Sequence, residues 1–188
     1  MAREIDKYRK EEYQGRDRRL FKEWDMLDKK YSDDSRITAI IVKKQNAKSK
    51  LPEKYEIIFN LKTIVGVNPK NEQGLETPIF GNKHRMTIEL PELYPRVDGL
   101  PIFKFITDVW HPNIKFFGDD KIKGRVCLTF ADCPLTTSLA TYVGRIIDYL
   151  TYDDYFAEDR YPWPEDVLVA EWIRTQAEPN KWLNFTQE

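Results

Sequence analysis

The side chains in this sequence that are suited to covalent chemistry are two cysteines, Cys127 and Cys133, and two histidines, His84 and His111. A cysteine with a histidine base would suit a thiol hydrolase. Neither histidine lies in a signature of such a pair, and we interpret both as structural. Metal binding needs cysteine and histidine clustered at ligand spacing, so no metal site is expected. The patterns GxxxxGK[ST] and GxGxxG do not occur, so no dedicated nucleotide loop is predicted.

The informative stretch runs from residue 94 to residue 128. In order along the chain it carries Tyr94-Pro95, Pro101, His111-Pro112-Asn113, Gly124 and Cys127-Leu128. This order resembles the ubiquitin-conjugating enzyme family, whose members carry these motifs in one frame. Upstream, Arg19-Leu20 to Glu23 resembles the start of the family's first helix, and residues 77–81 resemble the turn before its third strand. The resemblance covers about residues 15–160.

The resemblance implies an acyltransferase that works through a cysteine thioester. A conjugating enzyme accepts a ubiquitin-like modifier from an activating enzyme and passes it to an amine of a target protein. Cys127 is then the nucleophile, and a thiol needs no adjacent histidine base for this exchange. The amide of Asn113 either stabilises the oxyanion of aminolysis or fixes the neighbouring loop. No cofactor is implied, since the activating enzyme uses the ATP. The alternative is a catalytically inactive variant that serves as a protein-binding module.

The remaining candidate residues are expected to have structural, substrate-steering or docking roles. His111 and Pro112, with Tyr94 and Pro95, are expected to be structural. The acids after the expected second helix are candidates for steering the incoming lysine, or are ordinary surface acids: Asp153, Asp154 and Asp159. The basic residues at the start of the first helix lie where the family docks its activating enzyme, or form an ordinary solvated face: Arg16, Arg18, Arg19 and Lys22.

One departure from the family concerns the active site itself. Asn113 precedes Cys127 by 14 positions, which is longer than the usual family gap. Residues 114–123 therefore resemble an insertion beside the cysteine, and this leaves the placement of Asn113 open. Divergent members of the family include bacterial enzymes that work with a dedicated ubiquitin-like protein, some in anti-phage defence, and the insertion favours such a member.

Hydrophobic periodicity predicts the elements that must position these residues. Apolar residues at helical spacing predict a helix around residues 20–31 and another over 138–151. Strands are predicted over residues 37–42, 55–67, 86–90 and 102–106, and the lysine-rich residues 43–54 are predicted to be an exposed loop. Pro164 suits the first turn of a last helix ending near Ala177, with Glu165 and Asp166 near its positive end. Strands followed by helices predict an α+β fold with an antiparallel sheet of about four strands. Cys127 is expected in an extended irregular segment.

Length, charge and composition restrict the class of protein further. The chain has 188 residues and a formal net charge of −1, which does not favour binding to nucleic acid or to an anionic membrane. We expect residues 1–18 to be a polar extension of the first helix or a mobile arm, and residues 19–188 to be one catalytic domain. There is no long apolar run and no apolar signal core. Together with two cysteines that do not form a disulfide framework, this predicts a cytoplasmic protein.

Overall fold

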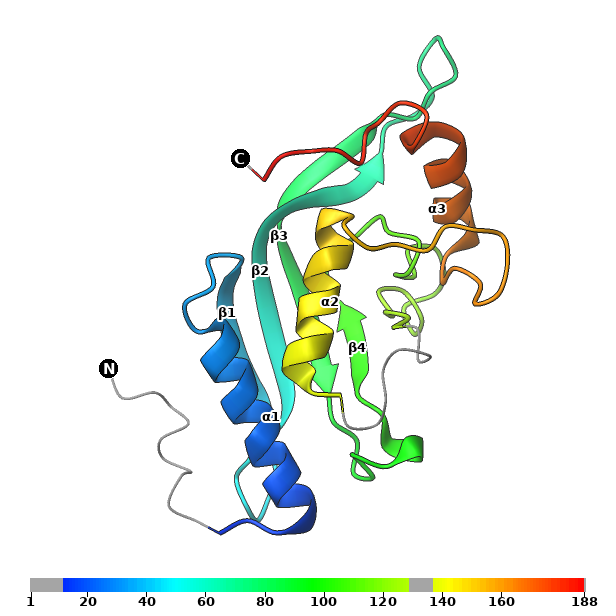
Figure 1. Cartoon of the computed structure of the whole chain (residues 1–188). Helices are drawn as coiled ribbons and strands as arrows, with labels where there is room; N and C mark the ends of the chain where they lie inside the picture. Colours follow the sequence, from blue (N-terminus) through cyan, green and yellow to red (C-terminus); the bar gives the residue numbers. More distant parts are fainter. Residues whose placement is uncertain (1–11, 129–136, 188) are drawn as a thin grey trace.

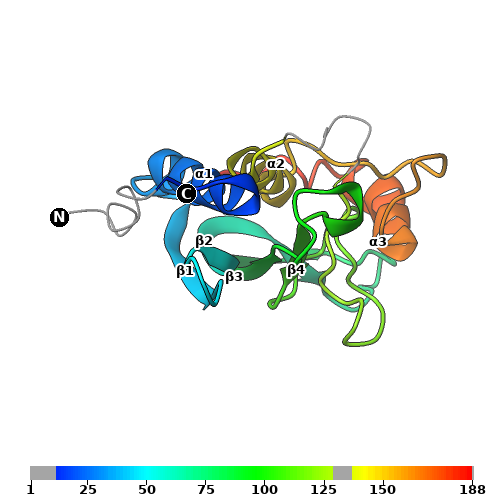
Figure 2. The same cartoon turned by 90° about the horizontal axis from the view of Figure 1, so that it is seen from below.

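The structure is a computed structural model that describes residues 12–128 and 137–187. One four-stranded antiparallel sheet has the order β1-β2-β3-β4, formed by β1 (Ile37–Gln45), β2 (Pro52–Val67), β3 (Pro78–Glu89) and β4 (Ile102–Phe105). Helices α1 (Gly15–Tyr31) and α2 (Leu139–Thr151) cover one face of this sheet (Figures 1 and 2). The α+β fold predicted from the sequence is therefore confirmed.

The main core lies between the two helices and the sheet. The apolar stripe that predicted α1 is buried, and so is the stripe of α2, because a 3.6-residue period places each stripe on one side of its helix. Alternate residues of β2 and β3 face these stripes, as a period of two requires. The buried side chains on these four elements include Leu20, Trp24, Leu27, Tyr55, Ile57, Phe59, Met86, Ile88, Val143, Ile146 and Ile147.

A second, smaller core lies at the far end of the sheet. Long strands β2 and β3 curve toward this end (Figure 1), and the amide of Trp110 donates to the carbonyl of Ile64 on β2 at 2.9 Å. Trp110 packs edge-on against Trp172 of α3 (Val167–Trp172), a short helix that continues into a π-helical turn, η4 (Ile173–Ala177). This second core fixes α3 beside the segment that carries the His-Pro-Asn motif.

Three sequence-based predictions about element bounds were wrong. The predicted loop over residues 43–54 is shorter than expected, because β1 extends to Gln45 and β2 begins at Pro52, so that only residues 46–51 connect the two strands. Residues 78–81 begin β3 rather than a turn before it. The last helix begins at Val167 instead of near Pro164, since Asp166 is its N-cap.

The polar extension predicted for residues 1–18 lies mostly outside the described residues, which begin at residue 12. Helix α1 itself begins at Gly15. A short 3₁₀ turn, η2 (Val97–Gly99), interrupts the proline-rich connection between β3 and β4. Within residues 12–128 and 137–187, no helix has both the length and the apolar character that crossing a membrane requires.

Candidate active site

Cys127 follows a short ladder that extends the sheet beyond β4. The amide of Phe105 donates to the carbonyl of Gly124 at 2.8 Å, and the amide of Val126 donates to the carbonyl of Phe103 at 3.2 Å. Lys104 and Arg125 lie opposite each other in this ladder. Cys127 itself is half-buried and belongs to neither a named strand nor a helix. The expected irregular segment is therefore present, and its start is anchored to β4.

Gly124 is required at the start of this segment for two physical reasons. Its φ of +82° lies in the left-handed region, where other L-residues are strained. A Cβ added at this position would also lie 2.1 Å from the carbonyl oxygen of Phe105. The glycine of the Gly-x-x-Cys-Leu motif thus lets the chain approach β4 closely enough to fix the position of Cys127.

The insertion does not displace Asn113 from the cysteine, because its two ends pair with each other. The amide of Cys127 donates to the carbonyl of Asn113 at 2.8 Å, and the amide of Lys115 donates to the carbonyl of Arg125 at 2.8 Å. Ile114 lies directly opposite Val126 between these bonds. Residues 116–123 leave the sheet as a loop, and Asn113 lies opposite Cys127 in spite of the long spacing.

This register divides the side chains between two faces. Ile114 is buried in the main core, and Val126 packs against it. Because side chains alternate along a strand and opposite residues share a face, the neighbours of this pair share the other face. That face carries Asn113, Lys115, Arg125 and Cys127.

Asn113 is buried and held by its side-chain oxygen. Its Oδ1 accepts from the amide of Phe156 at 2.8 Å, and only 3% of the residue is exposed. Among the described residues, its Nδ2 group has no hydrogen-bond partner. The side-chain amide is thus fixed through its oxygen, while the main-chain carbonyl of Asn113 is the group that contacts Cys127.

His111 is built into the core of this loop and cannot act as a base. Its ring stacks on Tyr149 at a centroid distance of 4.8 Å. Its Nδ1 accepts from the amide of Asn113 at 3.1 Å, so its Nε2 donates to the carbonyl of Asp154 at 3.3 Å. Burial lowers the pKa of His111 to about 3. His84 lies on β3 with its Nε2 at the carbonyls of Leu61 and Gly81, so both histidines are engaged in structural contacts.

Among the residues that the structure describes, no base forms a hydrogen bond with the thiol of Cys127, and the pKa of this thiol is raised, which favours its protonated form. Burial raises the pKa of Cys127, the Glu165 carboxylate raises it further, and the Arg125 guanidinium lowers it in part. Arg125 and Glu165 form an ion pair, with their nearest atoms 2.6 Å apart. The opposite charges of this pair therefore act on the pKa of the thiol in opposite directions.

The segment at residues 165–166 was not recognised from the sequence as part of the site. Asp166 is 1% exposed, and its amide donates to the carbonyl of Pro112 at 2.9 Å. Its carboxylate accepts from the amides of Phe116 and Phe117 in the insertion and lies 3.6 Å from the Lys115 ammonium. The sequence placed Glu165 and Asp166 correctly near a helix N-terminus, but this signal did not reveal their contacts with the insertion.

Tyr94 has a structural role that links three segments. Its hydroxyl donates to the Glu23 carboxylate at 2.6 Å and accepts from Arg19 at 3.1 Å. Glu23 also accepts from the amide of Leu139 at the start of α2. The Tyr94–Pro95 peptide bond is cis. This buried cluster ties α1 and the proline-rich connection to the helix that follows Cys127.

The four basic residues of the proposed docking face separate into two kinds. Arg16 pairs with Glu53 at 2.8 Å and donates to main-chain carbonyls, and Arg19 pairs with Glu23 at 2.6 Å. Arg18 and Lys22 are exposed. Only the latter two are therefore presented on the surface of α1 without a role in its packing.

The proposed lysine-steering acids are not brought to Cys127 by any contact within the described residues. Asp154 pairs with Arg145 at 3.2 Å, and its carbonyl accepts from His111. Asp153 is exposed and accepts from the Thr151 hydroxyl at 2.6 Å. Asp159 is exposed. Cys133 lies outside the described residues.

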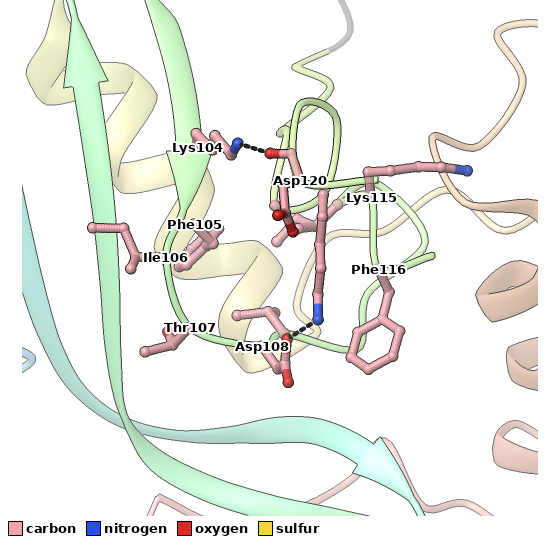
Figure 3. A pocket seen from close by; sticks show the side chains of 12 residues that line it. Lys104, Phe105, Ile106, Thr107, Asp108, Lys115, Phe116 and Asp120 are labelled. Atoms are coloured by element: carbon pink, nitrogen blue, oxygen red, sulfur yellow. Dashed lines mark hydrogen bonds and ion pairs between the residues drawn. The ribbon is translucent and has the colours of Figure 1, made fainter. Parts of the chain in front are cut away.

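A cavity of about 420 Å³ lies between β4 and the insertion (Figure 3). Lys104 reaches across it to the carbonyl of Asp120, and Lys123 forms an ion pair with Asp108 at 2.7 Å. The Lys115 side chain leads away from the cavity (Figure 3). Cys127 does not line it. In the part of the chain that the structure describes, no group of three or more His, Cys, Asp or Glu residues is arranged to hold a metal ion.

Known proteins resemble this chain in fold over most of its length and in sequence over a short stretch. No family model matches the chain. A stretch of 53 residues, 28% of this chain, is 38% identical to human Ubiquitin-conjugating enzyme E2 K and covers 23% of that protein. The same length is 40% identical to Ubiquitin-conjugating enzyme E2-22 kDa of Drosophila melanogaster. A solved structure described as a ubiquitin conjugating enzyme of Plasmodium yoelii has a TM-score of 0.54 and 19% sequence identity, over 89% of this chain and 90% of that one.

These findings confirm the resemblance to ubiquitin-conjugating enzymes. The chain has their α+β fold along most of its length, and part of it is similar to them in sequence. The matched stretch is less than a quarter of the length of the curated relatives.

Proposed function

We propose that the chain accepts a ubiquitin-like modifier as a thioester on Cys127 and passes it to an amine of a target protein. The observation that carries this proposal is the main-chain pairing of Cys127, whose side chain is half-buried, with Asn113, on the fold of conjugating enzymes. The modifier, the activating enzyme that supplies it and the target protein are the implied partners.

The geometry suits thioester exchange better than hydrolysis. A thiol hydrolase needs a base within hydrogen-bond reach of the cysteine, and both ring nitrogens of His111 are engaged by the main chain. In exchange, the incoming thiol and the leaving thiol are chemically similar, so no strong base is required. As the new C–S bond to Cys127 forms, the C–S bond to the cysteine of the activating enzyme breaks, and the proton of the Cys127 thiol passes to the departing sulfur.

Aminolysis of the thioester has a different requirement, because its tetrahedral intermediate carries an oxyanion. With Oδ1 held by Phe156, the Nδ2 group of Asn113 is the donor that we assign to this oxyanion. One preorganised donor of this kind is worth roughly 2.7–4 kcal/mol in the transition state. Asn113 is thus a catalytic residue in the second step, and its main-chain carbonyl positions Cys127.

A gel assay tests the proposal. The protein is incubated with ATP, a panel of ubiquitin and ubiquitin-like modifiers, and the activating enzyme of each modifier. We expect a higher-mass band that a thiol reductant removes and that Cys127→Ser converts to a reductant-resistant form or abolishes. Cys133→Ser is the matched control and should leave the band near its wild-type intensity. A chain that is charged by no member of the panel would be a binding module instead.

The divergent insertion is the reason to include modifiers other than ubiquitin. In a bacterial source, genes for an activating enzyme and a ubiquitin-like protein beside this one would support a dedicated conjugation pathway, including one used against phage.

A further inference from the structure

The register at the base of the insertion makes Lys115 a near neighbour of Cys127. Lys115 is opposite Arg125, which precedes Cys127 by two positions. By the alternation of side chains, Lys115 shares the face of the cysteine. Diagonal neighbours of this kind in an antiparallel pair are about 7–8 Å apart, a gap that long side chains span.

The contacts of the Lys115 ammonium keep it near this face. Its Nζ donates to the carbonyl of Glu165 at 3.4 Å and lies 3.6 Å from the Asp166 carboxylate. Glu165 is also the acid whose charge acts on the Cys127 thiol. Lys115 is therefore anchored at the segment whose Glu165 carboxylate pairs with Arg125, two positions before Cys127 in the ladder.

Lys104 is the matched comparison within the same ladder. It too is opposite Arg125, so it is also a diagonal neighbour of Cys127. Its ammonium, however, donates to the carbonyls of Asp120 and Lys121 at the far end of the insertion. The two lysines are equivalent in register, and their ammonium groups are held at different places.

We propose that Lys115 is a self-modification site, which receives the acyl group from Cys127 of the same molecule. This inference rests on the thioester chemistry proposed above. The Lys115 ammonium first releases a proton to solvent. The free amine then attacks the thioester carbonyl, a C–N bond forms and the C–S bond breaks. The amine's second proton passes to the departing Cys127 sulfur, which returns as a thiol. The product is an isopeptide on the insertion, and no oxidant or further reactant is consumed.

The test uses an acyl donor that does not depend on the natural modifier. The full chain carrying Cys133→Ser, so that Cys127 is its one thiol, is incubated with a short peptide that ends in Gly-Gly as a C-terminal arylthioester. Hydroxylamine, which cleaves thioesters and spares amides, separates the two products, and peptide mapping by mass spectrometry locates the amide. The variants are Lys115→Arg, which keeps the charge beside Asp166, its match Lys104→Arg, and Cys127→Ala.

We expect acylation of Cys127 followed by migration of the acyl group to Lys115. Lys115→Arg should slow formation of the stable product by about tenfold or more, and Lys104→Arg by less than about twofold, because only a correctly oriented neighbour gains a large effective concentration. Cys127→Ala should give neither product. Acylated Cys127 that keeps its acyl group, or passes it equally to Lys104, would overturn the assignment of Lys115 and leave the proposed function standing. Failure of Cys127 to be acylated at all would overturn both.

Discussion

Replacement of Asp166 by alanine should destabilise the protein and detach the insertion from α3. The Asp166 carboxylate accepts four main-chain N–H groups: those of Leu168 and Val169 in α3, at 3.2 and 3.3 Å, and those of Phe116 and Phe117 in the insertion, at 2.9 and 2.8 Å. One side chain therefore both caps the helix and holds the loop beside the cysteine. Alanine would leave all four donors without this acceptor.

The magnitude follows from these contacts. Loss of an N-cap costs about 1 kcal/mol, and each hydrogen bond to a charged acceptor contributes about 1.5–3 kcal/mol when it is buried. Phe117 is 40% exposed, so water replaces part of the loss in the loop. We expect the free energy of unfolding to fall by about 2–4 kcal/mol.

Urea denaturation followed by tryptophan fluorescence measures this change, since Trp110 and Trp172 lie in the second core beside Asp166. With a slope of about 2 kcal/mol per molar urea, the midpoint should fall by about 1–2 M. Asp159→Ala removes an exposed acid from the same connection and should change stability by less than about 0.5 kcal/mol. If the two variants unfold at the same urea concentration, the carboxylate of Asp166 does not hold the insertion.

The other predictions concern pH, chemistry and docking. Burial lowers the pKa of folded His111 to about 3, whereas in the unfolded chain this histidine binds a proton below its ordinary pKa of about 6.5, so the contribution of His111 should lower the free energy of unfolding by about 1.4 kcal/mol per pH unit as the pH drops further. In urea titrations above about pH 5, where carboxylates hardly titrate, His111→Phe should reduce this dependence of stability on pH. An unchanged dependence would refute the prediction. Asn113→Asp keeps the acceptor for Phe156 and replaces the Nδ2 donor, so in single-turnover assays discharge to free lysine should slow by roughly 10²–10³-fold with charging retained; equal discharge would assign Asn113 a structural role. Reversing the charge of exposed Arg18 and Lys22 should slow charging by the activating enzyme at low salt without shifting the urea midpoint, and unchanged charging would remove the proposed docking face.

Sequence periodicity predicted the elements whose burial is local in origin. The stripe Leu20, Trp24, Leu27 and Tyr31 predicted α1 because its spacing matches the helical period, and these residues are buried. The lysine-rich ends of β1 and β2 were misassigned to a loop for an equally local reason. Lys43 and Lys44 are exposed on the edge strand β1 and give it the composition of a loop, although its backbone remains paired with β2.

The Gly-x-x-Cys-Leu motif likewise predicted an irregular segment around Cys127, but the residues that contact this segment and the insertion were less predictable. The position of Asn113 depends on how the insertion folds back, and this is fixed by main-chain bonds near Gly124 that sequence spacing does not report. Asp166 is separated from Phe116 by 50 residues, and a lone acid before a helix predicts only a cap. The contacts of Arg19 with Glu23 and Tyr94 were likewise not predictable, because a basic residue at the start of a helix does not report its partners in other segments.

The most direct test of the account is to locate the acyl bond formed by the charged protein. After incubation with ATP, a modifier from the panel and its activating enzyme, intact mass spectrometry should show one added modifier, less one water. Peptide mapping should place the modifier's C-terminal carboxyl on the sulfur of Cys127, in a bond that hydroxylamine cleaves. An adduct on Cys133, or no adduct with any modifier of the panel, would contradict the assignment of Cys127 as the residue that carries the modifier.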